Sequence, residues 1–153
     1  MRITLIRHAQ ALHNIHIRDP ELIANSRLSE KGREQSVNLE LSVDILVVSP
    51  LRRAIETYSN SKIKCKEIIV SYLFREQPES MDQVVNFLEN EERFVETEDQ
   101  VRVRAQEAKK FLLSLKGDSV AIITHGIFIY RLLEGFGKPY QPVHNVESIS
   151  FDV

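Results

Sequence analysis

Short apolar runs separated by helical segments account for most of the chain. Apolar runs of this kind are typical of strands that are buried on both faces of a sheet. Three of them, at residues 3–6, 44–48 and 119–124, are predicted to form buried strands, and residues 67–70 are predicted to form a further strand. The last segment, residues 148–152, instead alternates polar and apolar side chains, as a half-exposed edge strand does.

Helix-start signals precede several of the segments between these strands. Ser29 is a favoured N-cap, and Ser49 with Pro50 supplies a cap followed by the preferred first helical residue. Capping boxes begin at Ser80 and at Thr97. These signals and the apolar spacing predict helices over residues 29–41, 51–58, 80–88, 97–116 and 127–134.

The alternation of strands and helices predicts an α/β fold, with a mixed, mostly parallel sheet that helices cover on both faces. A chain of 153 residues has the usual length of one domain, so we expect a single domain over residues 1–153. The first and fourth strands both end in a histidine and a small residue, His8-Ala9 and His125-Gly126. If these strands are neighbours, both histidines lie at one edge of the sheet, where ligands bind in open α/β sheets.

Charge and composition exclude several classes of protein. The formal net charge is −2, a balance that suggests neither a nucleic-acid partner nor a membrane-surface partner. Cys65 is the only cysteine, so no internal disulfide can form, which fits a reducing compartment. The apolar start of the chain is too short for a signal peptide, and no run approaches transmembrane length. We therefore expect a cytoplasmic protein in which any anion site is built locally.

Arg7, His8, Arg53 and His125 together suit a phosphoryl group. Such a group carries about two negative charges near neutral pH, and two guanidinium groups can hold its oxygens bidentately. A neutral histidine is a good nucleophile for phosphorus, and a second histidine, if protonated, would stabilise charge on a non-bridging oxygen. A carboxylic acid would protonate the leaving oxygen and then activate water. This chemistry requires no metal.

Other polar residues have simpler interpretations. Residues 9–28 lack clear periodicity and are expected to form a long loop with a short helical turn. His13 and His16 lie in this loop at a spacing that allows a metal site, but we interpret both as exposed loop histidines. Four cations are interpreted as the solvated face of the long helix: Arg102, Arg104, Lys109 and Lys110.

Several short motifs occur in an order that matches a known family. Arg7 and His8 begin a motif that matches Arg-His-Gly-Glu, with Ala9 and Gln10 at its last two positions. Further matching segments lie at residues 28–35, 49–57, 73–76, 124–126 and 145–149. The chain resembles the histidine phosphatase superfamily, also called phosphoglycerate mutase-like, over essentially its whole length.

The resemblance implies which residues carry the reaction. It implies His8 as the nucleophile that becomes phosphohistidine and Glu76 as the acid and base, with Glu79 and Asp82 as alternatives to Glu76. The register of the motif assigns the family arginine to position 53 rather than 52. The residues that the resemblance implies for binding phosphate and substrate are Arg7, Asn14, Arg53 and His125.

The resemblance also implies a fold and an activity. The fold would be a three-layer αβα sandwich with an antiparallel edge strand. The activity would be that of a histidine acid-type phosphatase, which hydrolyses a small phosphorylated substrate and releases inorganic phosphate without metal or cofactor. Hydrolysis is favoured because the chain is too short for the insertion and tail that close over bisphosphoglycerate in the mutases. Three alternatives stay open: a phosphoglycerate mutase, a protein phosphohistidine phosphatase, and a non-catalytic module that binds a phosphorylated ligand.

Overall fold

The computed structural model describes residues 1–15, 26–77 and 96–153. Its strands are β1 (Arg2–Arg7), β2 (Ser42–Val48), β3 (Lys64–Val70), β4 (Ser119–Thr124) and β5 (Ser148–Asp152). Its helices are α2 (Glu30–Val37), α3 (Arg52–Ser59), α4 (Glu98–Ser114) and α5 (Gly126–Gly135), with short 3₁₀ turns η1 (Leu12–Ile15) and η2 (Tyr72–Phe74). The helix predicted over residues 80–88 lies outside the described residues.

The strands form one sheet in the order β3-β2-β4-β1-β5. All neighbouring strands are parallel except β5, which runs antiparallel to β1 at the edge. The predicted pairing of the first and fourth strands is confirmed, because Arg7 at the end of β1 lies opposite Thr124 at the end of β4. One residue further on, the backbone N–H of His8 donates to the Thr124 carbonyl at 2.9 Å. The two strand-end histidines therefore lie at the same edge of the sheet.

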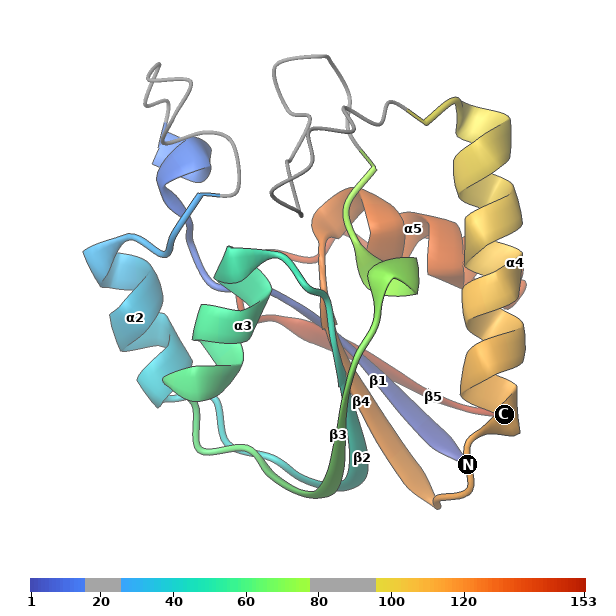
Figure 1. Ribbon diagram of the computed structural model, residues 1–153, viewed down its shortest axis with the longest axis horizontal. Helices are drawn as coiled ribbons and strands as arrows, with labels where there is room; N and C mark the ends of the chain where they lie inside the picture. Colours follow the sequence, from blue (N-terminus) through green and yellow to red (C-terminus); the bar gives the residue numbers. More distant parts are fainter. Residues whose placement is uncertain (16–25, 78–95) are drawn as a thin grey trace.

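Helices cover both faces of the sheet, with α2 and α3 on one side and α4 and α5 on the other (Figure 1). The alternation of side chains along β1 serves both layers. Ile3 and Leu5 belong to the core beneath α4 and α5, whereas Ile6 belongs to the core on the opposite face, with Ala54 of α3. This arrangement is the predicted three-layer αβα sandwich with a mixed, mostly parallel sheet.

The chain leaves β1 toward one face, through α2, and leaves β4 toward the opposite face, through α5 (Figure 1). β1 and β4 are neighbours, so the chain turns to opposite faces of the sheet at their carboxyl ends, which predicts a crevice at this point. In open α/β sheets this crevice is the usual place for a ligand. Within the part of the chain that the structure describes, no helix has the length and apolar character needed to cross a membrane.

Local capping signals predict the helix boundaries with mixed success. Ser29 caps α2 and accepts from the Gly32 N–H, and Thr97 opens α4 with the expected capping box. The prediction of Ser49 as a cap with Pro50 as first helical residue is wrong, because the N-cap of α3 is Leu51, which makes no side-chain cap bond. Two predicted helix ends are also too late, since α2 ends at Val37 and α4 at Ser114.

The interpretation of Arg104 as a solvated cation is also wrong, since only 5% of the residue is exposed. Val101 and Ala108, three residues before it and four after it, belong to the buried face of α4. Arg104 therefore lies on the same face of the helix. Its charge is paired inside the protein with that of Glu96, which is 6% exposed. Arg102 lies on the exposed side of the same helix.

Gly32 lies where α2 packs against the loop that follows His8. A Cβ atom at this position would lie 2.0 Å from the carbonyl oxygen of Gln10, so only glycine allows this approach. Gln10 is held by side chains at the start and end of α2: the Ser29 hydroxyl donates to its Oε1 at 2.8 Å, and its N–H donates to Gln35 Oε1 at 2.9 Å. The helix thereby fixes the loop that leaves the nucleophile candidate.

Candidate active site

A pocket of about 840 Å³ lies at the carboxyl ends of β1 and β4. Four of the predicted site residues line it, namely Arg7, His8, Asn14 and Glu76. The remainder of its described wall comes from the start of α5 and from the segment before β5: Gly126, Ile127, Tyr130, Tyr140, Gln141, Pro142, Val143 and His144, together with His13 of η1.

His8 is 2% exposed and is held in one tautomer. Its Nδ1 lies 2.6 Å from the carbonyl oxygen of Ala9, which can only accept, so Nδ1 carries the proton and Nε2 keeps its lone pair. Arg53 Nε donates to Nε2 at 3.2 Å, and the Asn145 amide donates to the His8 carbonyl at 2.8 Å. Burial, assisted by the charge of Arg53, lowers the pKa of His8 well below its ordinary value. His8 is therefore neutral, as a nucleophile must be.

His125, which is fully buried, lies beside His8 with 5.1 Å between ring centroids. Its Nε2 is 2.7 Å from the Ser49 hydroxyl, whose oxygen already accepts from the Leu51 N–H. The hydroxyl can donate to Nε2 or accept from it, and in the arrangement where Ser49 donates, the proton of His125 sits on Nδ1. That Nδ1 is buried and has no hydrogen-bond partner among the described residues. Burial lowers the pKa of His125 well below its ordinary value, so the ring is neutral.

Two arginines complete the cationic part of the site. Arg53 is 5% exposed; burial lowers its pKa to about 10, against the opposing charge of Glu76, so it stays charged at neutral pH. Arg52, by contrast, forms an ion pair with Glu56 on the outer side of α3. Arg7 donates through Nη1 to the Val143 carbonyl at 3.0 Å, while its buried Nε has no partner in the described parts of the chain. Such an unpaired buried donor is expected where a ligand completes the network.

Glu76 follows η2 in the chain, and its carboxyl lies beside the first turn of α5. The N–H groups of Phe128 and Ile127 donate to its carboxyl oxygens at 3.0 and 3.4 Å, and the Gln77 N–H donates at 2.9 Å. Burial raises the pKa of Glu76, although the charge of Arg53 and these amides oppose the rise. A carboxyl that keeps its proton to higher pH suits a general acid. The alternatives at positions 79 and 82 lie outside the described residues.

His13 is placed by the short turn η1, and the interpretation of it as an exposed loop histidine is wrong. It is partly buried, lines the pocket and lies 5.8 Å from His8 between ring centroids. Asn14 donates to its Nε2 at 3.2 Å, so its Nδ1 proton is donated to Ser26 at 2.9 Å. Asn14 itself accepts from the Ala11 N–H at 3.0 Å. His16 lies outside the described residues, and within the described ranges no three His, Cys, Asp or Glu side chains gather as a metal site would require.

Ser49 is the contact that the sequence reasoning missed. The Ser-Pro sequence fits a helix cap, but the hydroxyl is used across the sheet to orient His125. The contact follows from the strand order, because β2 and β4 are neighbours. Ser49 comes directly after β2, and His125 comes directly after β4. Identifying this contact requires the strand order, which the local sequence does not contain.

Burial of His13 predicts that the protein loses stability in acid. Burial lowers the pKa of His13 from 6.5 to about 4, so below pH 6.5 the unfolded chain binds a proton that the folded protein does not. This contribution to stability is therefore present above pH 6.5 and is lost as the pH falls through about 4. Denaturant unfolding between pH 7 and pH 4 should show a smaller pH dependence for His13→Gln than for the original protein. The exposed His144→Gln is the control, and an unchanged pH dependence in His13→Gln would contradict the assignment.

The family model of the histidine phosphatase superfamily (branch 1) matches residues 3–149. No curated protein sequence matches the chain. Among solved structures, a phosphoglycerate mutase from Thermus thermophilus is similar with a TM-score of 0.70 and 18% identity, covering 99% of this chain and 93% of that one.

Two phosphatase structures show a comparable likeness. A mutant phosphoserine phosphatase from Entamoeba histolytica, in complex with phosphoserine, has a TM-score of 0.66 and 16% identity, covering 99% of this chain and 90% of that one. A mycobacterial glucosyl-3-phosphoglycerate phosphatase, in complex with VO₃, has a TM-score of 0.65 and 18% identity, covering 97% of this chain and 91% of that one. At these identities the likeness establishes the fold.

Proposed function

This chain belongs to the histidine phosphatase superfamily, branch 1, and on that premise we propose that it hydrolyses phosphomonoesters through a phosphohistidine intermediate on His8. The observation that carries the proposal is the pair of adjacent, neutral, buried histidines and the hydrogen bonds at their ring nitrogens. His8 offers a lone pair on Nε2, and in the tautomer that we propose, with Ser49 as donor to Nε2, His125 offers an unpaired N–H on Nδ1; the two rings are adjacent and lie beside one pocket. A nucleophile and an oxyanion donor at this separation suit attack on a phosphoryl group.

In the proposed first step, the lone pair on His8 Nε2 attacks phosphorus, and the bond from phosphorus to the ester oxygen breaks. The proton of the Glu76 carboxyl passes to that oxygen, so the leaving group departs as a neutral alcohol. Arg7, Arg53 and the Nδ1–H of His125 donate to the non-bridging oxygens, where negative charge is concentrated in the transition state. The Arg53 donor that contacts His8 in the free protein would move to the phosphoryl group.

In the proposed second step, water attacks the phosphorus of phosphohistidine. The Glu76 carboxylate removes one proton from the water, the bond from phosphorus to Nε2 breaks, and the electron pair returns to His8. Inorganic phosphate leaves, and Glu76 is again protonated. Both half-reactions use side chains alone.

The pocket wall favours hydrolysis over mutase chemistry. A phosphoglycerate substrate carries a carboxylate as well as a phosphate, and a bisphosphoglycerate carries a second phosphate, so a mutase needs cations at two places. Arg7 is the one arginine or lysine among the described residues that line the pocket. The described wall beyond it includes uncharged residues such as Ile127, Tyr130 and Pro142.

The proposal is tested by phosphate release from a broad panel of phosphomonoesters, measured with and without EDTA and with added vanadate. We expect turnover that EDTA leaves unchanged and that vanadate inhibits, with a coupled mutase assay on 3-phosphoglycerate and a bisphosphoglycerate primer giving no signal. Mutase turnover in place of phosphate release would contradict the proposal. Binding of vanadate without hydrolysis of any panel member, phosphorylated proteins included, would favour the non-catalytic alternative.

A further inference from the structure

Glu96 and Arg104 form a buried ion pair next to the active site. Arg104 Nε lies 2.9 and 3.1 Å from the two carboxylate oxygens, and its Nη2 lies 2.7 Å from Oε2. The two side chains are 2% and 6% exposed, and Arg75 contacts the same carboxylate. Burying such a pair costs desolvation that often cancels its attraction, so stability alone is a weak reason to retain it. The remaining contacts of Arg104 indicate another role.

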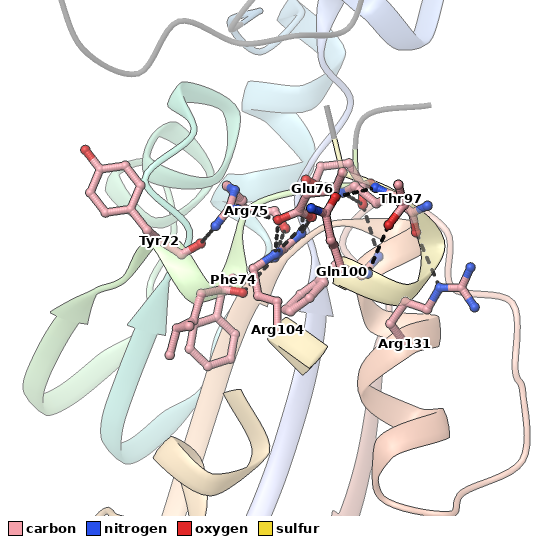
Figure 2. Close-up of polar contacts among 12 residues, drawn as sticks. Tyr72, Phe74, Arg75, Glu76, Thr97, Gln100, Arg104 and Arg131 are labelled. Atoms are coloured by element: carbon pink, nitrogen blue, oxygen red, sulfur yellow. Dashed lines mark hydrogen bonds and ion pairs between the residues drawn. The ribbon is translucent and has the colours of Figure 1, made fainter. Parts of the chain in front are cut away.

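The rest of the Arg104 guanidinium binds the main chain that leads into Glu76. Its Nη1 donates to the carbonyl oxygens of Leu73 and Arg75, both at 2.8 Å, and its Nη2 reaches the carbonyl of Glu76 at 3.4 Å. Figure 2 shows Arg104 directed at this segment, with Arg75 and Glu76 above it. Residues 75–77 have no regular secondary structure. Arg104 therefore supplies hydrogen-bond donors that a strand or helix would otherwise provide.

A side chain at the end of a sheet strand also binds this segment. The hydroxyl of the buried Thr124 donates to the Phe74 carbonyl at 2.6 Å. Thr124 is the last residue of β4 and immediately precedes His125. All four consecutive carbonyls over residues 73–76 are thus bound by side chains, three of them by Arg104.

Arg104 also contacts the residue that binds the carboxyl group of Glu76. Its guanidinium carbon lies 4.2 Å from the centre of the Phe128 ring, and the Phe128 N–H donates to Glu76 Oε1 at 3.0 Å. One guanidinium group therefore touches both the backbone of Glu76 and the residue that orients its carboxyl. Displacements of about 1 Å at a reacting group can cost on the order of 100-fold in rate, so this contact is placed where it affects proton transfer.

We propose that Arg104, held in place by Glu96, is the positioning residue for the acid and base Glu76. This inference rests on the proposed function, because it needs Glu76 to protonate the leaving oxygen. Arg104 touches no reacting atom. It acts by fixing two parts of the protein that hold the Glu76 carboxyl: the backbone of Glu76 itself and Phe128 in the first turn of α5.

The test compares two substrates that differ in their need for an acid. An alkyl phosphate must have its leaving oxygen protonated, whereas the phenolate of 4-nitrophenyl phosphate leaves without a proton. The rate of alcohol release in the first turnover, measured by rapid quench, reports only the step in which Glu76 acts as acid. For Arg104→Lys we expect this rate to fall by roughly 10- to 100-fold with the alkyl phosphate and by less than about 2-fold with the aryl phosphate. Lysine keeps the charge but lacks the planar fork that reaches both carboxylate and carbonyls.

Three variants complete the experiment. Glu76→Gln should show the same leaving-group dependence, and adding Arg104→Lys to it should cause no further loss, because both changes remove one function. Arg102→Gln, on the exposed side of α4, should change neither rate. Glu96→Gln, which keeps an acceptor for Arg104, should show the same selectivity with a smaller loss, and it provides the test if Arg104→Lys does not fold.

Each outcome decides a separate question. Equal losses on both substrates, or no loss on the alkyl phosphate in a folded variant, would overturn the positioning role while leaving the phosphatase proposal in place. If Glu76→Gln shows no leaving-group dependence, Glu76 is not the acid, and the inference falls with that part of the proposed function. Loss restricted to the alkyl phosphate in both Arg104→Lys and Glu96→Gln would support it.

Discussion

His8→Ala should reduce phosphomonoester hydrolysis by about 10⁴-fold or more, because it removes the imidazole that forms the covalent intermediate beside His125 and Arg53. The assay is steady-state phosphate release with the best substrate of the panel. Loss of a covalent nucleophile differs from loss of a binding contact, since the residual rate should not recover at saturating substrate.

The control for this variant is His144→Ala, which removes an exposed histidine from the rim of the same pocket. We expect it to keep turnover within about 3-fold of the original, as is usual for surface substitutions. The fold of His8→Ala should be checked by circular dichroism and by its binding of vanadate. Ordinary turnover by a folded His8→Ala protein would refute the assignment of the nucleophile.

Arg53→Gln should lower kcat/KM by about 100- to 1,000-fold, the loss typical of a donor that stabilises transition-state charge. Arg53 is buried against Nε2 of His8, and its charge is one reason that the pKa of His8 is low. The variant should therefore also raise the pKa of His8, which NMR titration of the imidazole can measure. Arg53→Lys should recover only part of the activity, because an ammonium cannot reproduce a bidentate fork.

Arg52 provides a matched control at the adjacent position. It carries the same charge, but it forms an ion pair with Glu56 on the outside of α3. Arg52→Gln should leave kcat/KM within about 2-fold and the pKa of His8 unchanged, since exposed ion pairs contribute little. Similar losses in the two variants would show that general positive charge, and not the contact with His8, supports the reaction.

Much of the fold and the meeting of the two histidines can be predicted from the sequence. Continuous apolar runs identify the parallel strands, and the alternation over residues 148–152 identifies the antiparallel edge. His8 and His125 each follow directly after an apolar strand. The assumption that these two strands are neighbours is therefore enough to place the histidines together. These features depend on local periodicity, which a single sequence contains.

The contacts that sequence reasoning misjudges involve partners that no local sequence rule identifies. Ser49 satisfies a local rule for helix caps, but its hydroxyl bonds to a histidine 76 residues away. Arg104 is assigned to solvent because of its charge, although its spacing from Val101 and Ala108 places it on the apolar face; its partner, Glu96, precedes the helix and belongs to no apolar pattern. The sequence pattern assigns His13 to solvent because the turn that directs this histidine at the pocket is set by Ser26 and Asn14. In each case a buried polar group is stabilised by a partner that only the folded chain supplies.

The most direct test of the account is to trap and locate the phosphorylated intermediate. The protein would be mixed with a fast substrate of the panel, quenched within the first turnover in alkali, and analysed by mass spectrometry and by ³¹P NMR. The account predicts one phosphoryl group on Nε2 of His8, stable in alkali and labile in acid, which disappears into inorganic phosphate at the rate of turnover. Hydrolysis that proceeds with no phosphoryl group on His8, or with the group on another residue, would contradict it.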